Sequence, residues 1–445
     1  MHTECSVAPN RRAFLQMVAG AAAWAAVAGT IPEIAAAQQS TPRGGHLYMQ
    51  TNETRNAIIR YRWAASGTLA EVERVATGGA GSGELSPIYH VNRPNDFEGA
   101  GSVILTPDRR FLFTTNAGDN SVSSFAIDKE GSLTLLDVKR TGNTTSGGAK
   151  SLAYAPSSRT LFVLHTVGPD HLRLMSVDDK GKLTARPERY SVNTKDWPNR
   201  GPTMVVLSPD GKFLVVATAF DELPSRKNPD GSLILWIPRP DGTLHVIVSN
   251  APDPDGIVVF PVGKDGGLGE PSFYDARGAV PFYIAFLHNR PDTFLIGFGV
   301  ADGLAMGRID AEGKINVGPI VKIDTSAGLP SEVCWLAVSP DDRFVFTTNF
   351  GYSTISSFRI DGNGLSIAKD PASPKVKGDG TFRAIDGVVS SGPSDSWLTP
   401  DGAYLYQIYG NASKLVGYAT QRDGSLKEIT NVKIPYNSPE GLAGF

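Results

Sequence analysis

Several ionisable residues stand just before short apolar runs, where an active site could be assembled. Glu98, Glu332 and Asp395 carry carboxylates, and a carboxylate can act as the general base that activates water for attack on a carbonyl group. Lys150 and Arg200 hold comparable positions, and their cationic groups suit the carboxylate of a substrate. This pattern predicts chemistry on a small anionic substrate, with Glu332 or Asp395 as the base.

Further polar residues near the ends of the same runs extend this candidate site. His165 is the imidazole that we place there, and imidazole titrates near neutral pH, which suits acid–base catalysis. Substrate binding is the role expected of Glu98 and of four other residues: Thr203, Tyr283, Asn116 and Asn349. For each of these residues the alternative is a loop cap, an ion pair or a solvated side chain. For Asp395 the alternative is a bond to backbone N–H groups beside its strand.

The motifs of other active sites are missing from the sequence. It contains no Gly-x-Ser-x-Gly, His-Glu-x-x-His or Gly-x-Gly-x-x-Gly pattern, and its histidines lack the spacing of metal ligands. The segment Asp253-Pro254-Asp255-Gly256 matches only the start of a calcium loop, so a turn is the better interpretation. We expect no metal site and no cofactor.

Seven short β-rich runs, each placed just after a turn, reveal an internal repeat. Turns such as Ser208-Pro209-Asp210-Gly211 precede most of them, and X-Gly turns such as Glu130-Gly131 follow within each unit. An apolar run also precedes each turn, so every unit has four predicted strands. The seven runs are Leu47–Asn52, Phe111–Asn116, Leu161–Thr166, Phe213–Thr218, Phe294–Gly299, Phe344–Asn349 and Tyr404–Tyr409.

Four antiparallel strands repeated seven times predict an all-β fold, a seven-bladed β-propeller over residues 38–445. The first unit lacks its innermost strand, whereas residues 441–445 form a strand without partners. We therefore expect the C-terminal strand to complete the first blade and to close the ring. A pair of β-sandwiches is the competing fold, but it does not explain this unpaired final strand.

Loop lengths favour one face of the ring as the functional face. Connections between second and third strands and between blades include every long segment, at 76–98, 186–200, 219–255 and 371–391. Long ordered loops often carry function, and the turns of the other face are short. The insertion 219–255 carries a predicted hairpin of its own and is either a lid over the channel or a surface insertion.

Composition narrows the classes of partner. The net charge is −3 and no block of Lys or Arg stands out, which argues against nucleic acid. The 48 glycines and 31 prolines predict many turns and exclude a coiled coil, but they follow no collagen-like period. We expect a monomer, with Cys334 buried in its apolar run.

Residues 1–37 have the three parts of a cleavable export signal. Arg11-Arg12 precede an uncharged apolar run, Met17–Ile31, and small residues follow at Ala35-Ala36-Ala37. The paired arginines resemble a twin-arginine signal, with an ordinary secretory signal as the alternative. An apolar run of this length is too short to span a bilayer comfortably. We expect export by the bacterial twin-arginine machinery to the periplasm or the medium, without a stable membrane anchor.

Three segments resemble the seven-bladed lactonase family, which includes 6-phosphogluconolactonases and carboxymuconate-lactonising enzymes. They are Leu-Ser-Pro-Asp-Gly-Lys-Phe-Leu-Val-Val-Ala-Thr (207–218), Thr-Thr-Asn-Phe-Gly-Tyr-Ser-Thr-Ile-Ser-Ser-Phe (347–358) and Leu-Thr-Pro-Asp-Gly-Ala-Tyr-Leu-Tyr (398–406). The resemblance covers 46–445 and implies metal-free chemistry on a carboxylate-bearing lactone by His, Arg and Glu in the central pocket. The chain departs from the family at these positions, where it has Thr203, Phe282, Tyr283 and Val300.

Two functions follow from this resemblance and its departures. The first is an exported enzyme that hydrolyses or isomerises a small, acidic lactone or sugar-acid derivative through another set of residues. The alternative is a non-catalytic propeller that binds a ligand or a partner protein through the same face.

Replacing Arg11 and Arg12 together by lysine should leave precursor in the cytoplasm, because the twin-arginine receptor reads the paired guanidinium groups. Fractionation and blotting of the wild-type and Lys-Lys precursors measure this directly. Unchanged export of the Lys-Lys precursor would favour the ordinary secretory signal.

Overall fold

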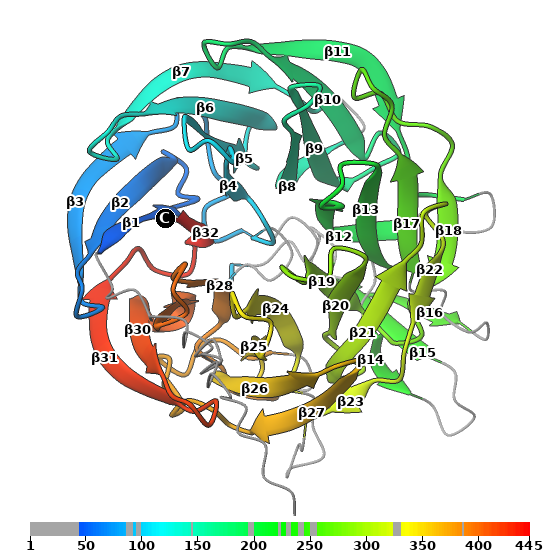
Figure 1. Ribbon diagram of the computed structural model, residues 1–445. Coiled ribbons are helices and arrows are strands. Elements are labelled where there is room, and N and C mark those ends of the chain that lie inside the picture. The colour runs from blue at the N-terminus through cyan, green and yellow to red at the C-terminus, as the bar shows by residue number, and fades with distance from the viewer. Residues whose placement is uncertain are drawn as a thin grey trace, which may run out of the picture. The chain divides into compact units, whose positions relative to one another are not determined.

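Short strands pair with their neighbours in sequence and form seven four-stranded antiparallel blades arranged as a ring (Figure 1). This computed structural model describes residues 44–445 except 86–91, 95–98, 144–145, 195–199, 221–223, 228–232, 239–243, 250–255, 324–330 and 385–386. The predicted signal at 1–37 and the candidate Glu98 lie outside the described residues. The all-β propeller predicted from the repeat is confirmed.

The blades follow one another in chain order, each with its innermost strand first. The first three are β32 (Glu440–Gly444), β1 (Gly45–Gln50), β2 (Ala57–Trp63) and β3 (Leu69–Ala76); β4 (Val103–Leu105), β5 (Phe111–Asn116), β6 (Ser121–Ile127) and β7 (Leu133–Arg140); and β8 (Gly147–Ala155), β9 (Thr160–Val167), β10 (Leu172–Val177) and β11 (Leu183–Tyr190). The fourth is β12 (Arg200–Leu207), β13 (Phe213–Phe220), β17 (Gly256–Pro261) and β18 (Ser272–Asp275).

The remaining three blades repeat the same order. They are β19 (Pro281–Phe286), β20 (Thr293–Phe298), β21 (Gly303–Ile309) and β22 (Ile315–Val317), with β23 (Val321–Lys322) also paired to β21; β24 (Val333–Val338), β25 (Phe344–Asn349), β26 (Thr354–Asp361) and β27 (Gly364–Lys369); and β28 (Pro393–Leu398), β29 (Tyr404–Tyr409), β30 (Lys414–Thr420) and β31 (Leu426–Lys433). A 3₁₀ turn, η2 (Gly410–Ala412), follows β29. No helix in the described part of the chain is long and apolar enough to cross a membrane.

The Pro-Asp turns share one hydrogen-bonding pattern that fixes where the second strand of a blade begins. The hydroxyl of Thr106 donates to Asp108 at 2.6 Å and accepts the N–H of Phe111 at 3.0 Å. Ser208 repeats this arrangement, with its hydroxyl 2.7 Å from Asp210 and 3.0 Å from the N–H of Phe213. Such local side-chain bonds favour turns over continued strands, which explains why the sequence showed these boundaries so clearly.

The hydrophobic core is divided among the contacts between neighbouring blades. One cluster joins the fourth and fifth blades through residues such as Val215 and Ile296, and another joins the third and fourth through Leu164 and Val216. Because each blade buries its faces only against its two neighbours, the ring is stable only when every blade has a partner on both sides.

Strand β32 closes the ring by pairing with β1, as predicted. Tyr48 lies opposite Ala443 and Met49 opposite Leu442 in this antiparallel ladder. Backbone bonds between His46 and Phe445, at 2.8 and 3.0 Å, extend the ladder to the last residue. The first and last strands of the described residues therefore belong to one blade.

The insertion between β13 and β17 contains a separate three-stranded sheet of β14 (Pro224–Lys227), β15 (Leu233–Pro238) and β16 (Leu244–Ser249). Strands β15 and β16 are the hairpin predicted from the sequence, with Leu233 opposite Ser249. A role for this insertion as a lid stays a prediction.

Deleting Ser438–Phe445 should lower the melting temperature sharply and broaden the transition, because the first blade loses its inner strand and exposes an open edge. Thermal unfolding followed by circular dichroism measures this. Leu442→Ala, which keeps the ladder but removes a buried side chain, should cost only about 2–5 kcal/mol. A truncated protein that melts like the full chain would contradict closure by β32.

Candidate functional site

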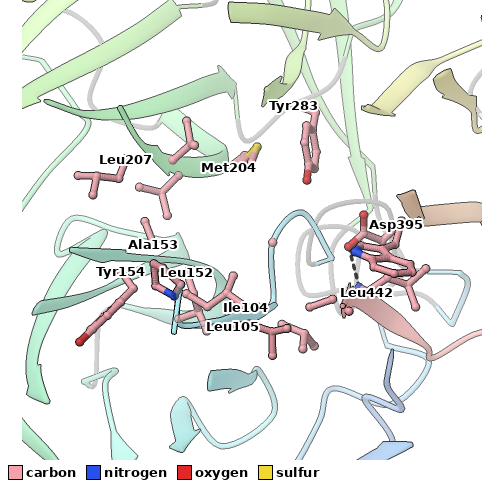
Figure 2. Close-up of a pocket in the computed structure, with 18 residues that line it drawn as sticks. Ile104, Leu105, Leu152, Ala153, Tyr154, Met204, Leu207, Tyr283, Asp395 and Leu442 are labelled. Atoms are coloured by element: carbon pink, nitrogen blue, oxygen red, sulfur yellow. Dashed lines mark hydrogen bonds between the residues drawn. The ribbon is translucent and has the colours of Figure 1, made fainter. Parts of the chain in front are cut away.

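The inner strands of six blades line one cavity in the central channel, with a volume of about 410 Å³ (Figure 2). This volume lies in the range of roughly 300–1,000 Å³ that is usual for small-molecule pockets. The wall is built from β4, β8, β12, β19, β28 and β32. Residues far apart in sequence, such as Ile104, Met204 and Asp395, thereby meet in one space.

The cavity lies in the half of the channel nearer to the Pro-Asp turns. Its wall includes Leu105 and Pro107 at the end of β4, Tyr154 near the end of β8 and Leu207 at the end of β12. All of these residues come from the second halves of inner strands or from the turns after them. The structure therefore places this cavity toward the opposite face from the one that loop lengths indicated.

Asp395, one of the predicted bases, lies in the wall of this cavity on β28. It is 2% exposed, and its Oδ2 accepts the N–H of Leu442 on β32 at 2.9 Å while its Oδ1 accepts the N–H of Ser396 at 2.8 Å. Burial raises the pKa of Asp395 to about 7, although these two hydrogen bonds oppose the shift. The carboxyl group therefore exchanges a proton near neutral pH, which suits a general acid or base.

Tyr283 on β19 lies in the same wall, with its ring directed into the open space between Met204 and Asp395 (Figure 2). Burial raises the pKa of the phenol far above its usual range, and the Asp395 carboxylate adds to the shift. Among the described residues, no hydrogen bond holds the Tyr283 hydroxyl. A protonated hydroxyl of this kind can donate to an oxygen atom of a ligand.

An aromatic cluster packs against Tyr283 in the channel. Trp335 is fully buried, and its ring lies 4.7 Å from that of Phe282 in a T-shaped contact. A Cβ added to Gly99, which precedes β4, would lie 3.5 Å from Cζ2 of Trp335, so this side chain reaches across from the sixth blade toward the second. Met204 belongs both to this cluster and to the cavity wall, and the cluster therefore forms the floor of the cavity.

Lys150 and Arg200, predicted to bind a substrate carboxylate, do not line this cavity. The buried ammonium of Lys150 donates to the carbonyl of Pro202 at 3.0 Å and so ties the third blade to the fourth. The guanidinium of Arg200 lies 5.3 Å from the ring of Phe273 on β18, the outer strand of its own blade. The structure does not bring these two cations to Asp395.

Three of the predicted binding residues have hydrogen bonds that hold strands and blades together. Thr203 donates to the carbonyls of Ala217 and Pro281, at 3.1 and 2.9 Å. The amide of Asn116 donates to Ser121 and Ser123, and that of Asn349 donates to Thr354 and Ser356, all within 3.0 Å. Both asparagines end a Thr-Thr-Asn sequence on a second strand, so the repeat places the same internal bond in two blades.

His165 and Glu332 are also placed away from the cavity wall. His165 lies between the Thr141 hydroxyl, at 2.8 Å, and the His171 carbonyl, at 3.1 Å, and burial lowers its pKa to about 4. It is therefore neutral at physiological pH. Glu332 is buried just before β24 at a φ of 58°, and its carbonyl accepts the N–H of Phe350. The described residues contain no group of three or more His, Cys, Asp or Glu side chains that could hold a metal.

Sequence reasoning missed the apolar residues that form most of the wall. Ile104, Leu105, Val206 and Leu207 are only partly buried, although they belong to inner strands. Their position directly before the Pro-Asp turns is the signal that could have identified them, because the inner strands reach the mouth of the channel there.

The contribution of Asp395 to the free energy of unfolding should fall as the pH rises from about 4 to 7, because the folded protein keeps the Asp395 proton that the unfolded chain releases. The slope reaches at most about 1.4 kcal/mol per pH unit for this one group. Asp395→Asn should remove this contribution, which denaturant titrations of both proteins at pH 5 and 8 would measure. In Asp379→Asn the slope over that range should stay unchanged, because hydrogen bonds from Tyr436 and Thr381 hold the pKa of Asp379 near 2. Equal slopes for wild type and Asp395→Asn would contradict the raised pKa.

Similar proteins point to one family. The 6-phosphogluconolactonase of Erwinia tasmaniensis is 20% identical over 336 residues, which are 75% of this chain and 84% of that protein. The same enzyme of Pectobacterium atrosepticum is 24% identical over 339 residues, or 70% of this chain and 96% of its own length. The TM-score is 0.58 to a periplasmic gluconolactonase of Pseudomonas aeruginosa and 0.61 to a protein of Lactobacillus plantarum. Both structures are 16% identical, and in both comparisons 90% of this chain and 99% of the other are covered.

A family model matches the chain over residues 40–197 and 89–296, which together span more than half of its length. Its description, lactonase with a seven-bladed β-propeller, agrees with the fold and with the named relatives. The chain therefore belongs to the seven-bladed β-propeller lactonase family.

Proposed function

We propose that this protein is a lactonase that hydrolyses a small lactone in the central channel, with Asp395 as the general base. The observation that carries this proposal is the position of Asp395 and Tyr283 in the wall of one cavity. One residue supplies a carboxyl group that ionises near neutral pH, and the other supplies an uncharged hydroxyl donor. Both kinds of group accelerate the hydrolysis of an ester bond.

The proposed reaction begins with water bound beside Asp395. The carboxylate takes a proton from this water as the oxygen attacks the lactone carbonyl carbon, and the Tyr283 hydroxyl donates a hydrogen bond to the oxyanion that forms. Collapse of the tetrahedral intermediate breaks the ring C–O bond, and protonated Asp395 returns the proton to the leaving alkoxide. The product is the open-chain hydroxy acid. Isomerisation would instead use the same base to remove a proton from the substrate.

The acidic substrate predicted from the sequence depends on Lys150 and Arg200. Neither cation lines the cavity, and the described wall contains no basic side chain. We therefore propose hydrolysis by Asp395 and Tyr283 without a contact to a substrate carboxylate. An acidic lactone held by Arg200 would require a second binding mode, for which Arg200→Ala should raise KM strongly.

Export remains part of the proposal. The paired arginines and the apolar run within residues 1–37 support transport by the twin-arginine machinery and a periplasmic or secreted location. The non-catalytic alternative, a propeller that binds a ligand or partner protein, is the outcome that remains if no lactone is hydrolysed.

Asp395→Asn should lower kcat for lactone hydrolysis by about 100-fold or more, since a positioned base contributes roughly 10²–10⁴-fold. For the wild type, kcat/KM should rise with pH through about 7, as Asp395 ionises, and then level off. Tyr283→Phe should lower kcat by about 100-fold with little change in KM, because its donor acts on the developing oxyanion. Steady-state assays that follow acid release with a pH indicator measure the kinetics of both variants and the pH dependence of the wild type.

Tyr274→Phe is the control, since it removes a hydroxyl from the outer strand β18, outside the cavity wall. Its kinetics should match the wild type. Full activity in both Asp395→Asn and Tyr283→Phe would move the chemistry to other residues and end this assignment.

A further inference from the structure

We propose that the substrate is an uncharged lactone with an apolar alkyl tail, which extends from Tyr283 and Asp395 toward the Pro-Asp turns. This inference rests on the proposed function and specifies its substrate class. The observation that carries it is the chemical difference between the two parts of the cavity wall. Asp395 and the Tyr283 hydroxyl lie in one part of the wall, and the other side chains are mostly aliphatic, apart from Tyr154 and Trp397 (Figure 2).

The aliphatic part of the wall leaves apolar surface available to a ligand. Ile104 and Leu105 on β4 and Val206 and Leu207 on β12 are all partly exposed, and they line the same cavity. Removal of such surface from water is favourable in proportion to its area. An alkyl tail would cover these side chains, whereas a sugar ring would place hydroxyl groups against them without hydrogen-bond partners.

The charges of the wall exclude an anion from this cavity. Asp395 carries the single carboxyl group in the described wall, and no Lys, Arg or His accompanies it. A substrate carboxylate would therefore lose its hydration without gaining a cation, and it would repel ionised Asp395. An uncharged lactone avoids both the loss of carboxylate hydration and the repulsion by Asp395.

The floor of the cavity sets the direction of the tail. Trp335 and Phe282 fill the channel beyond Met204 and Tyr283, so a lactone ring beside the Tyr283 hydroxyl cannot extend its tail that way. The wall continues instead along the second halves of β4, β8 and β12 to Leu105 and Leu207 beside the Pro-Asp turns. The tail therefore lies in the half of the channel with short turns.

A series of γ-lactones with the same ring and different tails tests this inference on the full mature protein. From γ-butyrolactone through γ-octalactone to γ-undecalactone, kcat/KM should rise by about three- to fourfold for each methylene until the cavity is filled. Glucono-δ-lactone, which carries hydroxyl groups and no tail, should be hydrolysed least well. A flat series, or a preference for glucono-δ-lactone, would overturn the inference.

Matched variants test whether the dependence on tail length comes from the cavity wall or from a general change in surface polarity. Leu105→Asn should flatten the dependence of kcat/KM on tail length, because it places a polar group in the aliphatic part of the cavity wall. Leu135→Asn makes the same change on the outer strand β7, where Leu135 is 37% exposed, and should leave the whole series unchanged. If Leu105→Asn does not fold, Val206→Trp narrows the same cavity and should reduce kcat/KM most for the long-tailed substrates, with Val72→Trp on β3 as its control.

The results distinguish this inference from the proposed function. If hydrolysis requires Asp395 but its rate does not depend on tail length, the proposed lactonase function stands and the inference of an apolar-tailed substrate is overturned. If no lactone is hydrolysed, the lactonase fails, and calorimetric binding of the same series decides the ligand class. Binding that strengthens with tail length and weakens in Leu105→Asn supports an apolar-tailed ligand, and binding that is absent or independent of tail length overturns it.

Discussion

The pairing of β32 with β1 is the interaction on which the rest of the molecule depends. Each blade buries its faces against two neighbours, so an opening at one place exposes two faces and a strand edge. Asp395 takes part in this closure, because its Oδ2 accepts the N–H of Leu442 on β32. The carboxyl group that we assign to catalysis is therefore held in place by the closed ring, and closure creates the burial that raises its pKa.

Most of the polar residues that resemble catalytic groups in the sequence hold the repeat together. Asn116 and Asn349 end equivalent strands, and each is bonded to two hydroxyl groups of the next strand. Thr203 and Lys150 bond to carbonyls of neighbouring blades. Strand ends in a propeller leave backbone groups that need partners, and polar side chains supply them. Tyr283 differs from these residues because its hydroxyl faces the cavity.

A few large side chains separate the part of the channel near the long loops from the cavity. Trp335 from the sixth blade reaches Gly99 at the start of the second, where an added Cβ would lie in ordinary van der Waals contact with the indole ring. Phe282 packs against Trp335 at a position where the family resemblance implies a polar residue. Aromatic side chains thus occupy the part of the channel near the long loops, and the cavity is left on the other side.

The sequence alone determined the architecture and narrowed the site to a small group of residues. Its Pro-Asp turns and β-rich runs gave the number of blades, and the strands Phe111–Asn116 and Phe344–Asn349 have the predicted bounds. These features are local, because a turn needs only the hydrogen bonds of its own few residues. Asp395 and Tyr283 were among the candidates, but nothing local separated them from His165 or Asn116. Only the tertiary structure decided which candidates share a wall and which half of the channel is open. Those outcomes depend on residues from different blades, such as Trp335 and Gly99, which meet only when the ring closes.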